Sequence, residues 1–177
     1  MRVLIISPTP THPTNAGNRV RIVKLIEMLR NRGFQVHFLY VSLEGEAHAE
    51  MKAYFGEHLT VFRSKPLLKR FISNRLRAIF WNAGLSFLLP SAWYRYGIDD
   101  WYPNGLQKTC IDLSQRFNFD LVMCEYVFMS KALSYFSNSF KVIDAHDRLG
   151  NRDEMFTQVG LMPEWFSCTE SQEAIGL

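Results

Sequence analysis

The chain has 177 residues, of which 47% are hydrophobic, and this composition favours one packed domain over a disordered chain. Its three cysteines are widely spaced, which excludes a disulfide framework or a zinc cluster and indicates a reducing, cytoplasmic location. The formal net charge of +3 is small, and no recognition motif is present, so nucleic acid is not expected as a partner.

The first 41 residues have the pattern of a strand, a helix and a second strand. Residues 3–7 are an apolar run without alternation, which is typical of a buried parallel strand and is too short for a signal peptide or a membrane span. Residues 18–32 place apolar side chains at helical spacing, and Gly33 ends this helix. Residues 35–41 return to strand composition.

The remaining segments continue the alternation of strands and helices. Strands are predicted at residues 59–62, 121–124 and 142–145, and helices at 47–55, 67–80, 105–117, 129–136 and 162–175. This order predicts an α/β fold with a Rossmann-like, doubly wound parallel sheet. The last predicted helix, which would expose Glu164, Glu170 and Glu173, precedes no further strand, so a second domain is expected to follow it.

The loop after the first strand is a candidate phosphate site. Ligands of doubly wound sheets bind beyond the carboxyl ends of the strands, where the loops after Ser7, Cys124 and Ala145 should converge. The first loop opens into a helix at Gly17 and Asn18, and the free N–H groups and dipole of a helix start favour a diphosphate. The loop lacks the glycine patterns of dinucleotide and P-loop sites. The alternative is that Asn18 only caps the helix.

Acidic side chains and a histidine follow the later strands. His146, beside Asp147, is a candidate proton acceptor or ligand of a sugar hydroxyl, and Glu125 is a candidate hydroxyl acceptor at the same edge. The alternatives are an Asp147 that caps a turn, a partly buried polar His146 and a solvated Glu125. The segment around His146 offers too few donors for a metal site, so no metal is expected.

A basic stretch lies between Glu57 and Asp99, where the sequence has seven lysines and arginines and no acidic residue. Aromatic and aliphatic residues are interspersed with these charges, a combination that suits an anionic membrane surface. The predicted membrane contacts are Lys69, Arg70, Arg75, Arg77 and Trp81. The alternative is a core-facing helix with a solvated basic face.

Taken together, these segments resemble the N-terminal domain of family 4 glycosyltransferases of the GT-B fold. The matching segments span nearly the whole chain and are residues 1–7, 13–19, 29–36, Leu89-Pro90 followed by Tyr94, 119–125 and 142–147. The resemblance implies retaining transfer of a hexose from a nucleoside-diphosphate sugar to a polysaccharide or a lipid-linked glycan, in the biosynthesis of cell-surface polysaccharide. A lipid-linked acceptor would place the protein at the inner face of the membrane.

The resemblance also implies roles for individual residues. Gly17 and Asn18 would contact the donor phosphates, and His146 with Asp147 would face the reacting sugar. Glu125, Asn15 and Arg19 would bind the acceptor. Residues 1–177 would be the acceptor-side domain, and the donor-binding C-terminal domain, which is absent here, would act in cis or in trans. Without it we expect negligible activity, and we expect no cofactor besides the nucleotide sugar as co-substrate.

Two other interpretations stay open. The chain could be a non-catalytic half-transferase subunit that binds acceptor or membrane and docks a separate catalytic chain, which would require an exposed apolar surface near residues 160–177. It could also be an enzyme similar to sugar-nucleotide epimerases, although the missing dinucleotide fingerprint argues against this.

Overall fold

A computed structural model describes residues 1–43, 49–64, 68–85, 88, 95, 97–163 and 167–177. The chain divides into two compact units, each built from two stretches of sequence. The sheet unit comprises Met1–Ser64 with Trp101–His146, and the second unit comprises Lys65–Asp100 with Asp147–Leu177. No linker-like composition marks the boundaries, so the sequence did not predict this division.

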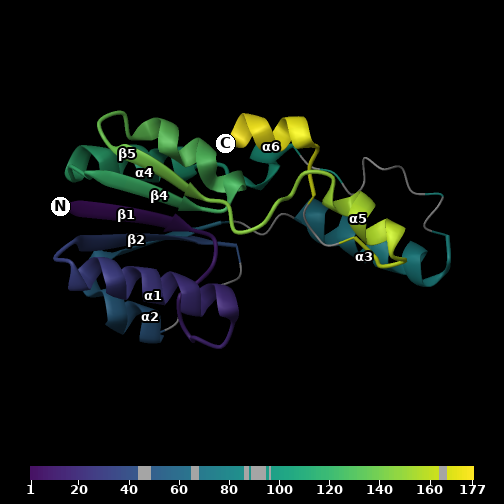
Figure 1. The fold of residues 1–177 in the computed structure, drawn as a ribbon, viewed down its shortest axis with the longest axis horizontal. Helices are drawn as coiled ribbons and strands as arrows, with labels where there is room; N and C mark the ends of the chain where they lie inside the picture. The colour runs from purple at the N-terminus through teal and green to yellow at the C-terminus, as the bar shows by residue number, and fades with distance from the viewer. Residues whose placement is uncertain (44–48, 65–67, 86–87, 89–94, 96, 164–166) are drawn as a thin grey trace. The chain divides into compact units, whose positions relative to one another are not determined.

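The sheet unit contains five parallel strands in the order β3-β2-β1-β4-β5 (Figure 1). The strands are β1 Arg2–Ser7, β2 Gln35–Ser42, β3 Leu59–Arg63, β4 Leu121–Glu125 and β5 Phe140–Asp144. The strand order reverses between β1 and β4, which is the topological switch point of a doubly wound sheet. The predicted Rossmann-like α/β fold is therefore confirmed.

Helices cover both faces of this sheet. α1 Gly17–Asn31 and α2 Ala49–Phe55 lie on one face, and α4 Leu106–Arg116 with the 3-10 segment η5 Val127–Tyr135 covers the other (Figure 1). This arrangement follows from right-handed crossovers between parallel strands. The remaining elements are the short 3-10 turns η1 Gly56–His58 and η4 Ile98–Trp101 and the helices α3 Leu68–Asn82, α5 Arg152–Gln158 and α6 Glu170–Gly176.

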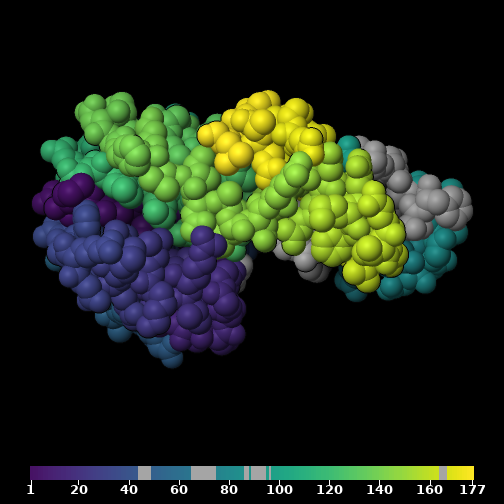
Figure 2. Space-filling view, viewed as in Figure 1, coloured from purple at the N-terminus to yellow at the C-terminus, as the bar shows by residue number. Residues whose placement is uncertain are grey.

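The core of the sheet unit lies between α1, α2 and the central strands. Ile22 and Ile26, one helical turn apart on α1, are fully buried and pack against a cluster that includes Ile5 and Phe38. Each such side chain contributes about 1.5–3 kcal/mol through burial. The space-filling view shows the segment that contains α1 at the surface of the sheet unit (Figure 2). The strands read as apolar runs because both faces are covered.

The structure corrects the prediction for the last helix. The helix predicted at 162–175 begins only after Thr169, whose hydroxyl accepts a hydrogen bond of 3.2 Å from the backbone N–H of Gln172. Glu173, predicted to be exposed, is buried and accepts hydrogen bonds from the N–H groups of Leu149 at 2.7 Å and Gly150 at 3.0 Å. Local periodicity could not reveal these partners, which lie more than twenty residues away. Glu164 lies outside the described residues.

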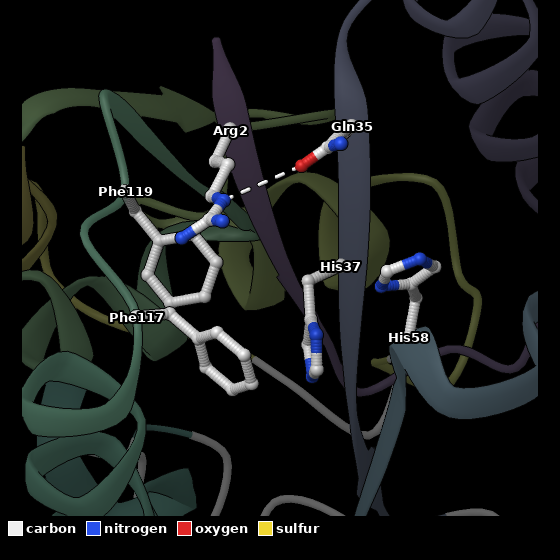
Figure 3. A pocket seen from close by; sticks show the side chains of 6 residues that line it. All are labelled: Arg2, Gln35, His37, His58, Phe117 and Phe119. Atoms are coloured by element: carbon white, nitrogen blue, oxygen red, sulfur yellow. Dashed lines mark hydrogen bonds between the residues drawn. The ribbon is translucent and has the colours of Figure 1, made fainter.

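A pocket of about 70 Å³ lies at the amino edge of the sheet, opposite the strand ends that we expected to bind ligands (Figure 3). Its most buried lining residue is His37, whose Nε2 lies 2.8 Å from Oγ1 of Thr60 and whose ring packs against Phe117. Burial, together with the smaller effects of the nearby His58 and Arg116, lowers the pKa of His37 to about 4. The pocket is lined by Arg2, Gln35, His37, His58, Phe117 and Phe119.

His37 should make the sheet unit sensitive to acid. The folded state keeps this ring neutral down to a pKa of about 4, whereas the unfolded chain binds a proton near the ordinary value of 6.5. The free energy of unfolding should therefore fall as the pH drops from about 6.5 to about 4, by on the order of 2 kcal/mol from this group.

Urea unfolding at pH 7 and pH 4.5 tests this expectation with two variants. His37→Gln should remove most of this acid-induced shift in midpoint, whereas His58→Gln, a substitution of the exposed histidine in the same pocket, should retain most of it. An equal shift for wild type and His37→Gln would show that His37 does not carry the effect.

Candidate active site

The carboxyl ends of β4 and β5 bring the predicted residues together. Glu125 is the last residue of β4 and lies opposite Asp144, the last residue of β5, in the parallel register. His146 follows two residues after β5, and one ligand atom from each of these three side chains lies within 4.8 Å of the others. The sequence therefore placed His146 and Glu125 correctly at one edge of the sheet.

His146 and Glu125 form a buried pair. Nε2 of His146 is in hydrogen-bond contact with Oε2 of Glu125, and the two side chains are 8% and 1% exposed. An ionised carboxylate can only accept a hydrogen bond, so in this contact Nε2 of His146 would be the donor, and a neutral ring in that tautomer would have its lone pair on Nδ1. Oε1 of Glu125 has no hydrogen-bond partner among the residues that the structure describes. The alternative of a solvated Glu125 is therefore wrong.

Tyr126 joins this pair, although the sequence analysis did not select it. Its ring stacks on the imidazole of His146 with a centroid distance of 4.2 Å and an interplanar angle of 11°. Nδ2 of Asn18 donates a hydrogen bond of 3.2 Å to the Tyr126 hydroxyl. The only sequence signal for Tyr126 is its place directly after a strand end.

Asp144 is held by Arg21, and neither residue was predicted to be functional. Nη2 of Arg21 contacts both carboxylate oxygens of Asp144, with side-chain exposures of 50% and 21%. Solvent screens such a pair, so its contribution to stability is small, but it ties the second turn of α1 to the end of β5. Asp144 could join His146 and Glu125 around a metal ion, which would have to share the Asp144 carboxylate with Arg21.

The start of α1 carries the predicted phosphate-binding residues. Gly17 is its first residue, and a Cβ at this position would meet nothing within 4 Å. The N-cap is Ala16, without a side-chain cap bond, so the alternative of Asn18 as the helix cap is wrong. Oδ1 of Asn18 instead accepts from the N–H of Arg19 at 2.9 Å. Nη1 of Arg19 donates to Oδ1 of Asn15 at 3.3 Å, so these two predicted acceptor residues contact each other.

Asp147 belongs to the second unit, unlike its neighbour His146. Its side chain is 63% exposed, and its Oδ2 lies 3.4 Å from Nη1 of Arg152. The structure does not include Asp147 in the group of Glu125, Asp144 and His146, and its catalytic role stays a prediction.

The predicted membrane residues lie on α3 in the second unit. Arg75 is exposed beside the apolar side chains of Leu76 and Ile79, which are 39% and 56% exposed. Arg77 is buried at 3% exposure, and Trp81 is half-buried, so this part of α3 presents Arg75 rather than both arginines. The side chains of Lys69 and Arg70 lie outside the described residues. Of the helices that the structure describes, none has the length and hydrophobicity needed to span a bilayer.

This edge of the sheet combines a helix start, which favours anions, with the paired side chains of His146 and Glu125. Oε1 of Glu125 is buried and has no hydrogen-bond partner among the described residues. Comparison of the chain with family models, curated proteins and solved structures finds no significant match.

Proposed function

We propose that this chain is the acceptor-side, N-terminal half of a GT-B retaining glycosyltransferase. It would transfer a hexose from a nucleoside-diphosphate sugar to a polysaccharide or a lipid-linked glycan. The observation that carries this proposal is the buried pair of His146 and Glu125 at the carboxyl ends of β4 and β5, connected through Tyr126 to the first turn of α1. The sequence resemblance to family 4 transferases supports the same assignment.

The start of α1 suits the diphosphate of a sugar nucleotide, and the surroundings of His146 suit its sugar. The open space around Gly17 admits a diphosphate to the first N–H groups of α1, where the helix dipole favours negative charge. Oε1 of Glu125 is buried, so at this edge a sugar hydroxyl would meet His146, whose Nδ1 would accept a hydrogen bond or a proton, as general base catalysis requires.

A donor-binding domain is needed to complete this chemistry. In the proposed enzyme it supplies the cationic groups that neutralise the leaving diphosphate and the second wall that excludes water. The sheet unit supplies an oriented histidine and a helix start. None of the residues to which we give a role in this unit would bind the nucleoside. We therefore expect binding, and little turnover, from residues 1–177.

Titration followed by backbone amide NMR tests the proposed ligand. Nucleoside-diphosphate hexoses at millimolar concentration should shift the amide signals of Gly17, Asn18 and His146, because the diphosphate and hexose contact this edge. His146→Gln should remove the shifts caused by the hexose and retain those caused by the nucleoside diphosphate alone. His58→Gln, at the opposite edge, should retain both. Shifts confined to the pocket around His37 would contradict the assignment, and shifts with NAD would favour the epimerase-like alternative.

A peripheral membrane contact fits a lipid-linked acceptor. The exposed Leu76 and Ile79 beside Arg75 form a small apolar and basic surface on α3. Such surfaces bind anionic lipid headgroups, and each well-placed Lys or Arg contributes about 1 kcal/mol.

Co-sedimentation with vesicles tests this contact. At low ionic strength the chain should bind vesicles that contain anionic lipid, and Ile79→Glu should lower the binding constant at least about fivefold, equivalent to about 1 kcal/mol. Met28→Glu, which changes a similarly exposed apolar residue of α1, should bind like the wild type. Failure of the wild-type chain to sediment with anionic vesicles would remove the proposal.

One observation favours a second candidate, the non-catalytic half-transferase subunit. Met155 on α5 and Val159, which directly follows this helix, are 63% and 68% exposed, and Leu161 and Ile175 are 56% and 73% exposed. The space-filling view shows α5 at the surface of the second unit (Figure 2). A docking surface for another chain would require that such apolar side chains form one contiguous patch. In a subunit of this kind, replacing His146 would leave the transfer rate of the partner unchanged.

A further inference from the structure

We propose that Tyr126 is a positioning residue, which holds the imidazole of His146 in its reactive orientation, and that Asn18 acts by anchoring the Tyr126 hydroxyl. The link to hexose transfer rests on the proposed function, whereas the positioning of the ring rests on the geometry alone. The inference adds a residue to the site and changes the role of Asn18.

The ring of His146 is restrained on two sides. The hydrogen bond to Glu125 fixes the position of Nε2. It leaves the imidazole ring free to tilt about this hydrogen bond. The Tyr126 ring, nearly parallel at 11° and 4.2 Å away, removes this freedom. A general base must be held close to its productive orientation, because small displacements lower the rate steeply. Tyr126 therefore supplies the restraint that Glu125 lacks.

The backbone at both residues is strained in a way that favours a functional explanation. Tyr126 has φ of 71° and His146 has φ of 60°, which bulky side chains rarely adopt. The N–H of Tyr126 donates to the carbonyl oxygen of Asp144 at 2.8 Å, and the N–H of His146 lies 3.4 Å from Oδ1 of the same residue. These contacts hold the segment after β4 against the segment after β5, so that the rings of Tyr126 and His146 lie face to face. Strained backbone conformations of this kind are concentrated at active sites and ligand-binding sites, where the orientation of a side chain is important.

Asn18 connects this stack to the start of α1. Its Nδ2 donates to the Tyr126 hydroxyl at 3.2 Å, while its Oδ1 accepts from the N–H of Arg19. Both ends of the carboxamide are therefore engaged within the protein. Contact with a phosphate would then fall to the backbone N–H groups of Gly17 and Asn18. A ligand bound there would lie next to the residue that steadies the Tyr126 ring.

The opposing interpretation is that Tyr126 only fills space, since its ring also stacks on Phe128 at 5.2 Å. A space-filling role would not depend on the hydroxyl or on Asn18. Stability measurements alone would not separate the two roles, so the test must observe the His146 ring directly.

The test is NMR of the histidine ring nitrogens and carbon-bound protons in the 177-residue chain. In the wild type, the stacked Tyr126 ring should shift the carbon-bound protons of the His146 ring upfield. Each of these protons should give one sharp signal. The ring-nitrogen shifts should indicate a proton on Nε2. Tyr126→Leu should remove the upfield shift and produce broadened or doubled signals. Tyr126→Phe should restore the upfield shift, and both Tyr126→Phe and Asn18→Ala should broaden the signal only partly.

Tyr54→Leu is the matched control, because Tyr54 packs against His12 in a similar ring contact elsewhere. It should leave the His146 signal unchanged. Unchanged His146 signals in a folded Tyr126→Leu chain would overturn the inference. If that variant does not fold, a His146 signal unaffected by both Tyr126→Phe and Asn18→Ala would overturn it instead.

Transfer measurements separate this inference from the proposed function. In the presence of a donor-binding domain, Tyr126→Leu should lower kcat about 10- to 100-fold with little change in the KM of the donor, and Tyr126→Phe should recover most of the rate. A rate for Tyr126→Leu equal to that of the wild type would overturn the catalytic part of the inference. If the wild type transfers no hexose while the His146 signals respond as expected, the positioning role stands and the proposed function fails.

Discussion

The burial of the Glu125 carboxylate is the constraint on which the candidate site depends. A buried charge is costly unless a partner and hydrogen bonds compensate for it, and His146 supplies the contact to Oε2. To make this contact, the chain leaving β5 turns back over the end of β4, with His146 in a left-handed backbone conformation. This one requirement links the position of the histidine to its burial. It also leaves Oε1 as an acceptor at the end of the sheet.

The first two turns of α1 belong to the same assembly. Asn18 reaches Tyr126 at the end of β4, and Arg21 reaches Asp144 at the end of β5. These links fix the helix start next to the histidine, although each is a weak interaction taken alone. A diphosphate at the helix start and a hexose near His146 would thus be parts of one ligand on one edge. The pocket around His37 lies at the other edge and takes no part in this arrangement.

The sequence predicted those features that depend on local pattern. The apolar runs of β1 and β2, the spacing of Ile22 and Ile26 and the alternation of elements led to the correct fold. The placement of Glu125 and His146 followed from the rule that strand ends converge in a doubly wound sheet. What the sequence missed depends on partners distant in the chain. Glu173 finds its hydrogen bonds across more than twenty residues, and the Arg21 pair with Asp144 spans 123 residues.

The most direct test of the account is hexose transfer by this chain together with the donor-binding domain that the proposal requires, compared between the wild type and His146→Gln. If His146 is the proton acceptor, its loss should lower kcat at least about 100-fold and leave the KM of the donor nearly unchanged, because in the proposed enzyme the diphosphate would bind at the start of α1. A His146→Gln chain that sustains the wild-type rate would contradict the account and would identify the chain as a non-catalytic subunit.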